Sequence, residues 1–124
     1  MTMKHAFLIM AHGSLPLLRV LLSMLDDERN DIFLHIDRKS DMLDGAEPLV
    51  LSKARLFLLE QRVDVRWGNL SQIKAEYVLF EEALKHGPYA YYHLLSGQDL
   101  PIKSQDYIHQ FFEEHQGKEF VGIN

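Results

Sequence analysis

Hydrophobic residues fall into short blocks along the chain, and their spacing alternates between that of strands and that of helices. His5–Ala11 is a continuous apolar run closed by His12-Gly13-Ser14, which predicts a strand buried on both faces. Ser14 can cap a following helix, and Pro16 is tolerated in its first turn. Five leucines then recur at helical spacing: Leu17, Leu18, Leu21, Leu22 and Leu25. Acidic residues at 26–28 oppose the helix dipole, so we expect this end to fray or to be matched by cations.

The middle of the chain carries weaker patterns. Residues 32–37 alternate and predict a second strand, with Ile32, Leu34 and Ile36 on one face and Phe33, His35 and Asp37 on the other. Residues 38–48 predict a loop, and residues 49–59 are apolar without a clear element. Val63 and Val65 alternate with charged neighbours, which predicts a third short strand ending at Trp67-Gly68.

The most clearly marked helix follows. Asn69 and Gln72 have capping-box spacing, and one apolar face ends near Gly87-Pro88. We expect that face to point inward; it consists of Leu70, Ile73, Tyr77, Phe80 and Leu84. Residues 89–95 predict a fourth strand. Ser104 can cap a last helix with Asp106 in its first turn and Ile108, Phe111 and Phe112 facing inward, before a further strand begins at residues 120–123.

Strands that alternate with helices predict an α/β fold, a Rossmann-like and mostly parallel sheet with right-handed crossovers and helices on both faces. Ligands of such sheets bind beyond the carboxyl ends of the strands. Polar residues cluster at the predicted strand ends, in the segments His12-Gly13, His35-Ile36-Asp37, Arg66-Trp67-Gly68 and Ser96-Gly97-Gln98-Asp99. The last strand has barely begun when the sequence ends, so we expect residues 1–124 to be one domain at the front of a longer protein.

Composition narrows the function classes. A chain of 124 residues with 47% hydrophobic and 25% charged residues is ordinary for one globular domain. Its net charge of −5 disfavours a broad nucleic-acid or anionic-lipid surface. It contains no cysteine, which excludes disulfides and thiolate metal sites. No apolar run is long enough to span a membrane, and no signal peptide is visible.

Two function classes remain open from the residues alone. His12, His35 and Asp37 have the donor atoms for a metal-dependent phosphoesterase or other hydrolase, although a strand histidine is more often a hydrogen-bonded core group. A non-catalytic α/β binding or scaffolding module is the other. Dinucleotide, P-loop and α/β-hydrolase motifs are all missing from the sequence, as is an Asp-x-Asp metal motif. A carboxylate at a strand end, such as Asp37, can instead accept hydrogen bonds from a nucleotide.

Four segments in the same order and spacing resemble the core-2/I-branching N-acetylglucosaminyltransferase family, which also contains the peptide O-xylosyltransferases. They are Ile9-Met10-Ala11-His12, residues 30–40 around His35-Ile36-Asp37-Arg38-Lys39-Ser40, residues 65–71 around Trp67-Gly68, and residues 94–104 around Ser96-Gly97-Gln98-Asp99. The resemblance implies a GT-A type fold, a UDP-sugar donor and inversion at the anomeric carbon without a metal cofactor. The missing Asp-x-Asp motif agrees with that implication.

Positions carried over from the family define the expected site. The resemblance implies that Ala11 and His12 lie beside the uridine and that Asp37 binds it. Arg62 and Trp67 would wall the nucleotide or support the sheet. Structural roles are the alternatives for several of these positions, such as a core aromatic for Trp67 and a surface side chain for Lys103. The expected rim near sugar and acceptor consists of Ser96, Gly97, Gln98, Asp99 and Lys103.

The sequence also departs from the family pattern. The first-loop proline is Pro16, four residues after His12 instead of three, and Asn69 stands where a second glycine is common. The catalytic glutamate of the family and the Arg/Lys pair that neutralises the diphosphate correspond to positions beyond Asn124. Inverting transfer needs both a base and positive charge, so we expect the chain to bind UDP but to be inactive alone.

Partners and location follow as expectations. The partners would be a UDP-sugar and a glycan or other hydroxyl acceptor, with no nucleic acid. An uncovered sheet edge also predicts self-association. Eukaryotic relatives are cysteine-containing Golgi membrane proteins, whereas this chain suggests a bacterial cytoplasmic enzyme, at most peripheral to the inner membrane and active in surface-polysaccharide assembly.

Overall fold

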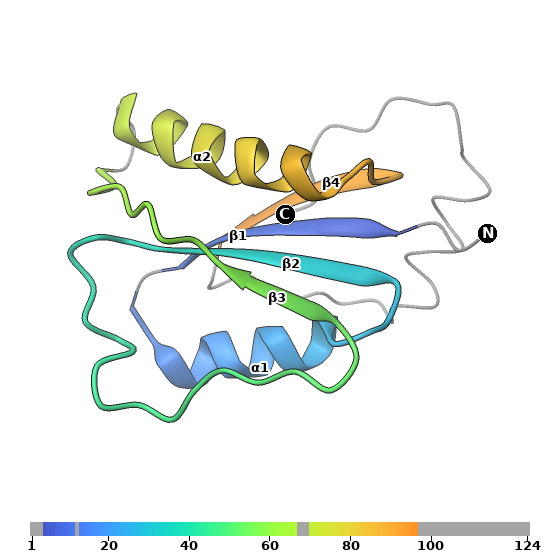
Figure 1. Cartoon of the computed structure of the whole chain (residues 1–124). Helices are drawn as coiled ribbons and strands as arrows, with labels where there is room; N and C mark the ends of the chain where they lie inside the picture. The colour runs from blue at the N-terminus through green and yellow to red at the C-terminus, as the bar shows by residue number, and fades with distance from the viewer. Residues whose placement is uncertain (1–3, 12, 67–69, 97–124) are drawn as a thin grey trace.

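The fold is a parallel sheet between two helices. The computed structural model describes residues 4–11, 13–66 and 70–96. The elements in chain order are β1 (His5–Ala11), α1 (Leu15–Leu25), β2 (Asn30–Ile36), β3 (Arg55–Leu58), α2 (Leu70–His86) and β4 (Tyr91–Ser96). The strands form one sheet in the order β3-β2-β1-β4, and every pair is parallel (Figure 1). The predicted α/β class with helices on both faces is confirmed.

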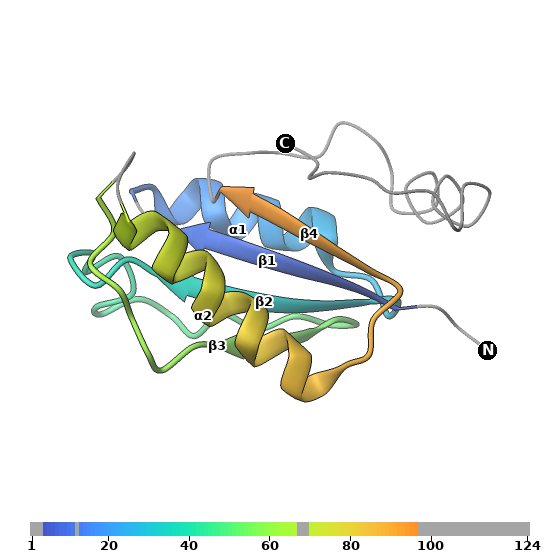
Figure 2. The ribbon, with the colours of Figure 1, turned by 90° about the horizontal axis from the view of Figure 1, so that it is seen from above.

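The first strand is the centre of the molecule. All seven residues of β1 are buried, because β1 has a strand on each side and a helix over each face. Phe7, Ile9 and Ala11 belong to the core on the α1 face. Leu8 and Met10 belong to the core on the α2 face, and Figure 2 shows α2 crossing above the sheet. From Ala6 to Ala11 the strand is apolar at every position, which fits a strand covered on both faces.

Helix α1 begins at a side-chain cap, and the residue after its last one, Asp26, holds a distant loop. The Ser14 Oγ accepts a 3.3 Å hydrogen bond from the Leu17 amide, as predicted. At the other end, the Asp26 carboxylate accepts 2.8 Å bonds from three consecutive main-chain amides at residues 52–54. The expected cation match is present at Asp27, whose carboxylate accepts two 2.8 Å bonds from the Arg29 guanidinium, whereas the partners of Asp26 are peptide N–H groups of a distant loop.

The third strand lies earlier in the chain than the sequence predicts. The structure has no strand at residues 63–65; β3 is formed by Arg55–Leu58 and pairs with β2. Val63 and Val65 are buried, as their alternation requires, but their amides bond to side chains instead of a neighbouring strand. The alternation of strands with helices also breaks here, since no helix joins β2 to β3.

The inward face of α2 differs from the predicted one. The residues buried against the sheet are Ala75, Leu79 and Ala83. All five apolar residues of the predicted inward face are exposed instead, namely Leu70, Ile73, Tyr77, Phe80 and Leu84. Small side chains let α2 lie close to the sheet, where large sheet residues such as Phe33 and Leu8 fill the interface.

Several predicted features lie outside the described residues. These include the capping Asn69, the helix expected from Ser104 and the strand expected at residues 120–123. The fourth strand is confirmed at Tyr91–Ser96, one or two residues later than predicted. Neither helix of the described part is long and apolar enough to cross a membrane.

Candidate functional site

The ends of β1 and β2 bring two predicted site residues together. The Asp37 amide donates a 3.0 Å hydrogen bond to the Ala11 carbonyl, which ties the residue after β2 to the last residue of β1. Ala11 is only 2% exposed, so its side chain packs in the core and its backbone forms the edge of the site. Asp37 therefore lies at the carboxyl edge of the sheet, where ligands of parallel α/β folds bind.

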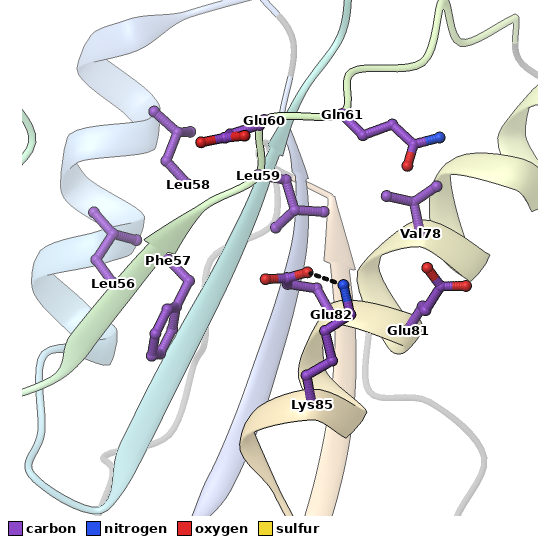
Figure 3. Close-up of a pocket in the computed structure, with 10 residues that line it drawn as sticks. All are labelled: Leu56, Phe57, Leu58, Leu59, Glu60, Gln61, Val78, Glu81, Glu82 and Lys85. Carbon is purple, nitrogen blue, oxygen red and sulfur yellow. Dashed lines mark hydrogen bonds and ion pairs between the residues drawn. The ribbon is translucent and has the colours of Figure 1, made fainter.

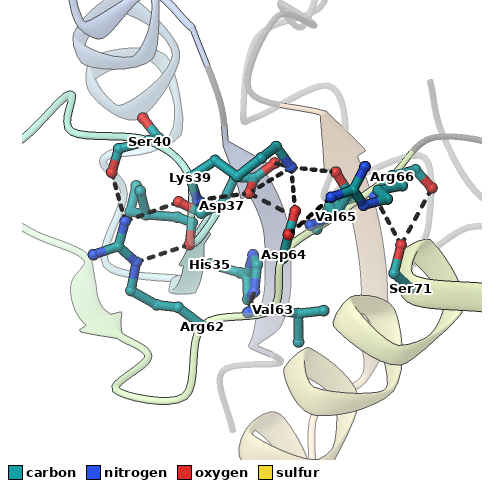
Figure 4. A network of polar contacts seen from close by, with 11 residues as sticks. His35, Asp37, Lys39, Ser40, Arg62, Val63, Asp64, Val65, Arg66 and Ser71 are labelled. Atoms are coloured by element: carbon teal, nitrogen blue, oxygen red, sulfur yellow. Dashed lines mark hydrogen bonds and ion pairs between the residues drawn. The ribbon is translucent and has the colours of Figure 1, made fainter.

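The Asp37 carboxylate is held by a network of donors, shown in Figure 4. Its Oδ1 accepts from the Lys39 amide at 3.0 Å, from Lys39 Nζ at 3.1 Å and from the Val65 amide at 3.4 Å. Its Oδ2 accepts from Lys39 Nζ at 3.1 Å and from no other group of the described residues. Burial raises the pKa of Asp37, but the donors from Lys39 and Val65 outweigh burial and hold the pKa below its ordinary value. Asp37 is therefore an ionised acceptor at neutral pH.

Lys39 joins two carboxylates and the adjacent loop. Besides Asp37, its Nζ lies 2.6 Å from Asp64 Oδ1 and 2.6 Å from the Val65 carbonyl oxygen. The hydrogen bond to Asp64 raises the pKa of Lys39, and the same contact lowers the pKa of Asp64. Neither Lys39 nor Asp64 has a role predicted from the sequence. Two basic residues directly after the strand-end Asp37 were the available signal for Lys39.

Arg62 supports the main chain around Asp37. Its guanidinium donates to three carbonyls: Ile36 at 3.1 Å, Asp37 at 2.8 Å and Ser40 at 2.6 Å. These bonds fix the turn that carries Asp37 and Lys39. Of the two predicted roles for Arg62, support of the sheet is the one its contacts match.

His35 links β2 to the segment after β3. Its side chain is fully buried, and Nε2 accepts a 2.9 Å hydrogen bond from the Val63 amide. Burial lowers the pKa of His35 more than neighbouring Asp37 raises it. The ring is therefore neutral, and its acceptor nitrogen is occupied by the backbone.

The metal-site alternative gains no support from the described residues. Within residues 4–11, 13–66 and 70–96, no group of three His, Asp or Glu side chains is placed to hold a metal ion. The Nε2 lone pair of His35 is used by Val63, and Asp37 is bound by Lys39. His12, the third expected ligand, lies outside the described residues.

The loop at residues 63–66 connects the site to α2. The Arg66 amide donates to Ser71 Oγ at 2.7 Å, and Arg66 Nη2 lies 3.5 Å from Asp64 Oδ2. Ser71 is in the first turn of α2. Contacts from β1 and from this loop thus meet at Asp37, and Ser71 ties the loop to α2 (Figure 4).

A separate hollow lies between β3 and α2 (Figure 3). It has a volume of about 600 Å³ and is lined by apolar β3 residues and by Glu60, Glu81, Glu82 and Lys85. Lys85 pairs with Glu82 at 3.3 Å. The excess of carboxylates repels a diphosphate, so this hollow does not fit an anionic nucleotide.

The remaining predicted site residues are not all described. Ser96 is the last residue of β4 and pairs with Met10 of β1, so its backbone lies at the same edge as Ala11. The others lie outside the described residues: His12, Trp67, Gly97, Gln98, Asp99 and Lys103. The structure thus brings Ala11, Asp37, Arg62 and the backbone of Ser96 to one edge of the sheet.

Comparison with known proteins identifies the family of the chain. No curated protein matches the sequence. The model of the family described as Core-2/I-Branching enzyme matches residues 5–123, which is nearly the whole chain. The parallel sheet and the polar edge at Asp37 agree with a Rossmann-like GT-A fold. The chain belongs to the core-2/I-branching enzyme family, a family of glycosyltransferases.

Proposed function

We propose that this chain supplies the uridine-binding part of an inverting, metal-independent glycosyltransferase that uses a UDP-sugar. The observation that carries the proposal is the ionised Asp37 carboxylate at the carboxyl edge of β1 and β2, whose Oδ2 can accept a further hydrogen bond. A carboxylate accepts hydrogen bonds but repels phosphate, so the groups it suits are the donor N–H of a base or the hydroxyls of a ribose. The diphosphate would then lie away from Asp37.

Charge neutralisation for the departing diphosphate has to come from elsewhere. The three cationic side chains of the Asp37 network already have partners: Lys39 with Asp37 and Asp64, Arg62 with carbonyls and Arg66 with Asp64. The proposed catalytic base and diphosphate-binding cations correspond to family positions beyond Asn124. We therefore expect this chain to bind UDP and to transfer no sugar alone.

The finer assignments rest on the resemblance. N-acetylglucosamine and xylose are the donor sugars used within the family, and the acceptor would be a glycan or another hydroxyl compound. A cysteine-free composition fits a reducing compartment, so the proposed setting is the bacterial cytoplasm, in surface-polysaccharide assembly.

Thermal unfolding with nucleotides tests the proposal. The chain is unfolded alone and with UDP, GDP, ADP, UDP-N-acetylglucosamine or UDP-xylose, each with and without EDTA. UDP at about ten times its dissociation constant adds roughly 1.4 kcal/mol, which raises the unfolding midpoint by several degrees in a domain of this size. The stabilisation should survive EDTA and be lost in Asp37→Asn. Asp41→Asn, an exposed carboxylate of the same loop, is the matched control.

Three outcomes would contradict the proposal. Equal stabilisation by UDP, GDP and ADP would remove the preference for uridine. Loss of the effect in EDTA would remove metal independence. Measurable sugar transfer by the 124-residue chain would refute its inactivity.

A further inference from the structure

Strand β3 forms one edge of the sheet. Among the described residues it pairs only with β2 (Figure 1). The Leu59 amide, directly after β3, donates a 3.0 Å hydrogen bond to the Leu34 carbonyl of β2. Successive residues of a strand direct their main-chain groups to opposite edges, so the N–H and C=O groups of Leu56 and Leu58 point away from β2. Such an edge can pair with a further strand.

The side chains of β3 do little to protect this edge. Natural sheets often protect an edge with lysine or proline, and β3 contains neither. Its one charged residue, Arg55, is paired with the buried Asp31. The other three residues are apolar, and Leu58 is 50% exposed. The edge is therefore suited to pairing with another chain.

A hollow adjoins each face of β3. On the α2 face is the hollow of about 600 Å³ described above (Figure 3). On the α1 face, a second hollow of about 300 Å³ lies between β3 and residues 43–49. Successive side chains of a strand point to opposite faces of its sheet. A strand added beside β3 would therefore direct its side chains alternately towards the two hollows.

The two hollows differ in chemistry. Around the α2-face hollow, Glu82 is paired with Lys85 at 3.3 Å, whereas Glu60 and Glu81 have no ion pair within the described part of the chain. This hollow suits a lysine or arginine side chain. The α1-face hollow is lined by leucine, alanine and proline side chains, apart from Glu47, and suits an apolar side chain.

Charge decides between a basic partner and a second copy of the chain. The net charge of the chain is −5. Pairing of β3 with β3 of another copy would bring two acidic hollows to one interface, and like charges repel. A basic segment is attracted by the same carboxylates. The surface therefore favours a basic partner over a second copy.

We propose that β3 binds an extended segment of a partner protein in which basic and apolar side chains alternate. The segment adds to the sheet beside β3 and forms main-chain hydrogen bonds with Leu56 and Leu58. Its basic side chains lie beside Glu60 and Glu81, and its apolar side chains enter the α1-face hollow. None of these residues belongs to the Asp37 network, so the proposal does not depend on UDP binding.

Fluorescence anisotropy with the 124-residue chain tests this chemistry. The ligand is a labelled octapeptide of alternating lysine and valine. The first control peptide has four lysines followed by four valines, and the second alternates glutamate with valine. The alternating lysine peptide should bind at least about tenfold more tightly than either control, because only it places a basic and an apolar side chain on opposite faces of a strand.

Charge variants test the α2-face hollow with the same peptide. Glu60→Gln combined with Glu81→Gln should weaken binding roughly three- to tenfold, the effect of two exposed ion pairs. Glu28→Gln combined with Glu76→Gln is the matched control, because it changes the net charge equally at residues that line neither hollow. The control should bind as the wild-type chain does. Equal weakening by the two double variants would overturn the proposal.

Amide hydrogen exchange followed by NMR locates the contact. Saturating peptide should slow exchange at Leu56 and Leu58 by roughly tenfold and leave Phe57 and Leu59 nearly unchanged, because the latter two amides face β2. No binding of the alternating lysine peptide, binding without this protection, or equal binding of a control peptide would overturn the proposal. Protection of Leu56 and Leu58 without peptide would also overturn it: in favour of a second copy if it increases with protein concentration, and of cover by the chain itself if it does not.

Discussion

Replacing Arg62 with Met separates a structural role of the guanidinium from a ligand-binding one. The side chain donates to the carbonyls of Ile36, Asp37 and Ser40, and the first two residues are almost fully buried. A hydrogen bond contributes about 1 kcal/mol net, and loss of an arginine partner leaves buried acceptors unpaired. Arg62 itself is exposed, so water replaces part of the loss. We expect Arg62→Met to lower the free energy of unfolding by about 2 kcal/mol.

Arg66→Met is the matched control. Arg66 belongs to the same connection between β3 and α2, but its side chain is 69% exposed and reaches Asp64 only at 3.5 Å. Exposed pairs of this kind contribute less than about 1 kcal/mol. Chemical unfolding monitored by circular dichroism, without nucleotide, compares the two variants with the wild-type chain. In thermal unfolding followed by the same signal, the midpoint of Arg62→Met should fall by roughly 6–10 °C.

An equal stability of the two variants would refute this reasoning. It would mean that the three carbonyl contacts do not stabilise the fold. If Arg62→Met kept its stability but lost UDP binding, the role of Arg62 would be to contact the nucleotide.

Two further predictions concern the carboxylates of Asp31 and Asp26. Asp31 is fully buried and accepts from Lys4 at 3.0 Å and from Arg55 and the Tyr89 hydroxyl at 2.5 Å. Burial raises the pKa of Asp31, but the hydrogen bonds from these donors outweigh burial, so the pKa in the folded state lies below the ordinary value of 3.8. The stabilisation by Asp31 is therefore fully present above pH 3.8 and is lost as the pH falls through the pKa of the folded state. The Lys4 and Arg55 side chains are 36 and 57% exposed, so water screens the charges that Asp31→Asn leaves behind, and the variant should cost roughly 1–3 kcal/mol at pH 7. The acid side of the stability curve measured by urea unfolding should flatten; an unchanged acid side would contradict this. Asp26→Ala should cost about 2 kcal/mol in the same assay through the amides at residues 52–54, with the exposed Asp44→Ala as a control that changes little.

Sequence patterns predicted β1, β2 and α1 well because these elements bury whole faces. The third strand was misplaced for a physical reason. Val63 and Val65 have the alternation of a strand. However, their amides donate hydrogen bonds to the side chains of His35 and Asp37 instead of to a neighbouring strand, and no pattern within residues 63–65 shows that. The true strand, Arg55–Leu58, lies at the sheet edge with half-buried and exposed residues, so its own periodicity is faint.

The spacing of large apolar residues predicts the wrong face of α2, because this spacing reflects side-chain size and not burial. Ala75 and Ala83 look neutral in a sequence, yet their small volume is what lets the helix approach the sheet. The larger apolar residues have the stronger periodicity but are exposed, namely Leu70, Ile73, Tyr77, Phe80 and Leu84. When a helix has two apolar sides, periodicity alone does not tell which of them packs on the sheet.

The positions of those site residues that lie at strand ends could be predicted from the sequence. Asp37 and Ala11 meet because parallel strands finish at one edge. The partners of Asp37 were not predictable, because Lys39 and Val65 reach it through a loop whose path depends on tertiary contacts. Arg62 was placed in the right region, while its pairing with carbonyls required the folded chain.

The central position of β1 has a consequence for synthesis on the ribosome. β1 pairs with β2 on one side, but its other side waits for β4, whose first residue pairs with His5 across 86 positions of the chain. At about 5–20 residues per second, that interval lasts roughly 4–17 s. During it, the nascent chain presents an apolar strand with one open edge, the kind of surface that pairs with other chains. Any slowing of translation between residues 11 and 91 should therefore increase aggregation before it affects the finished fold.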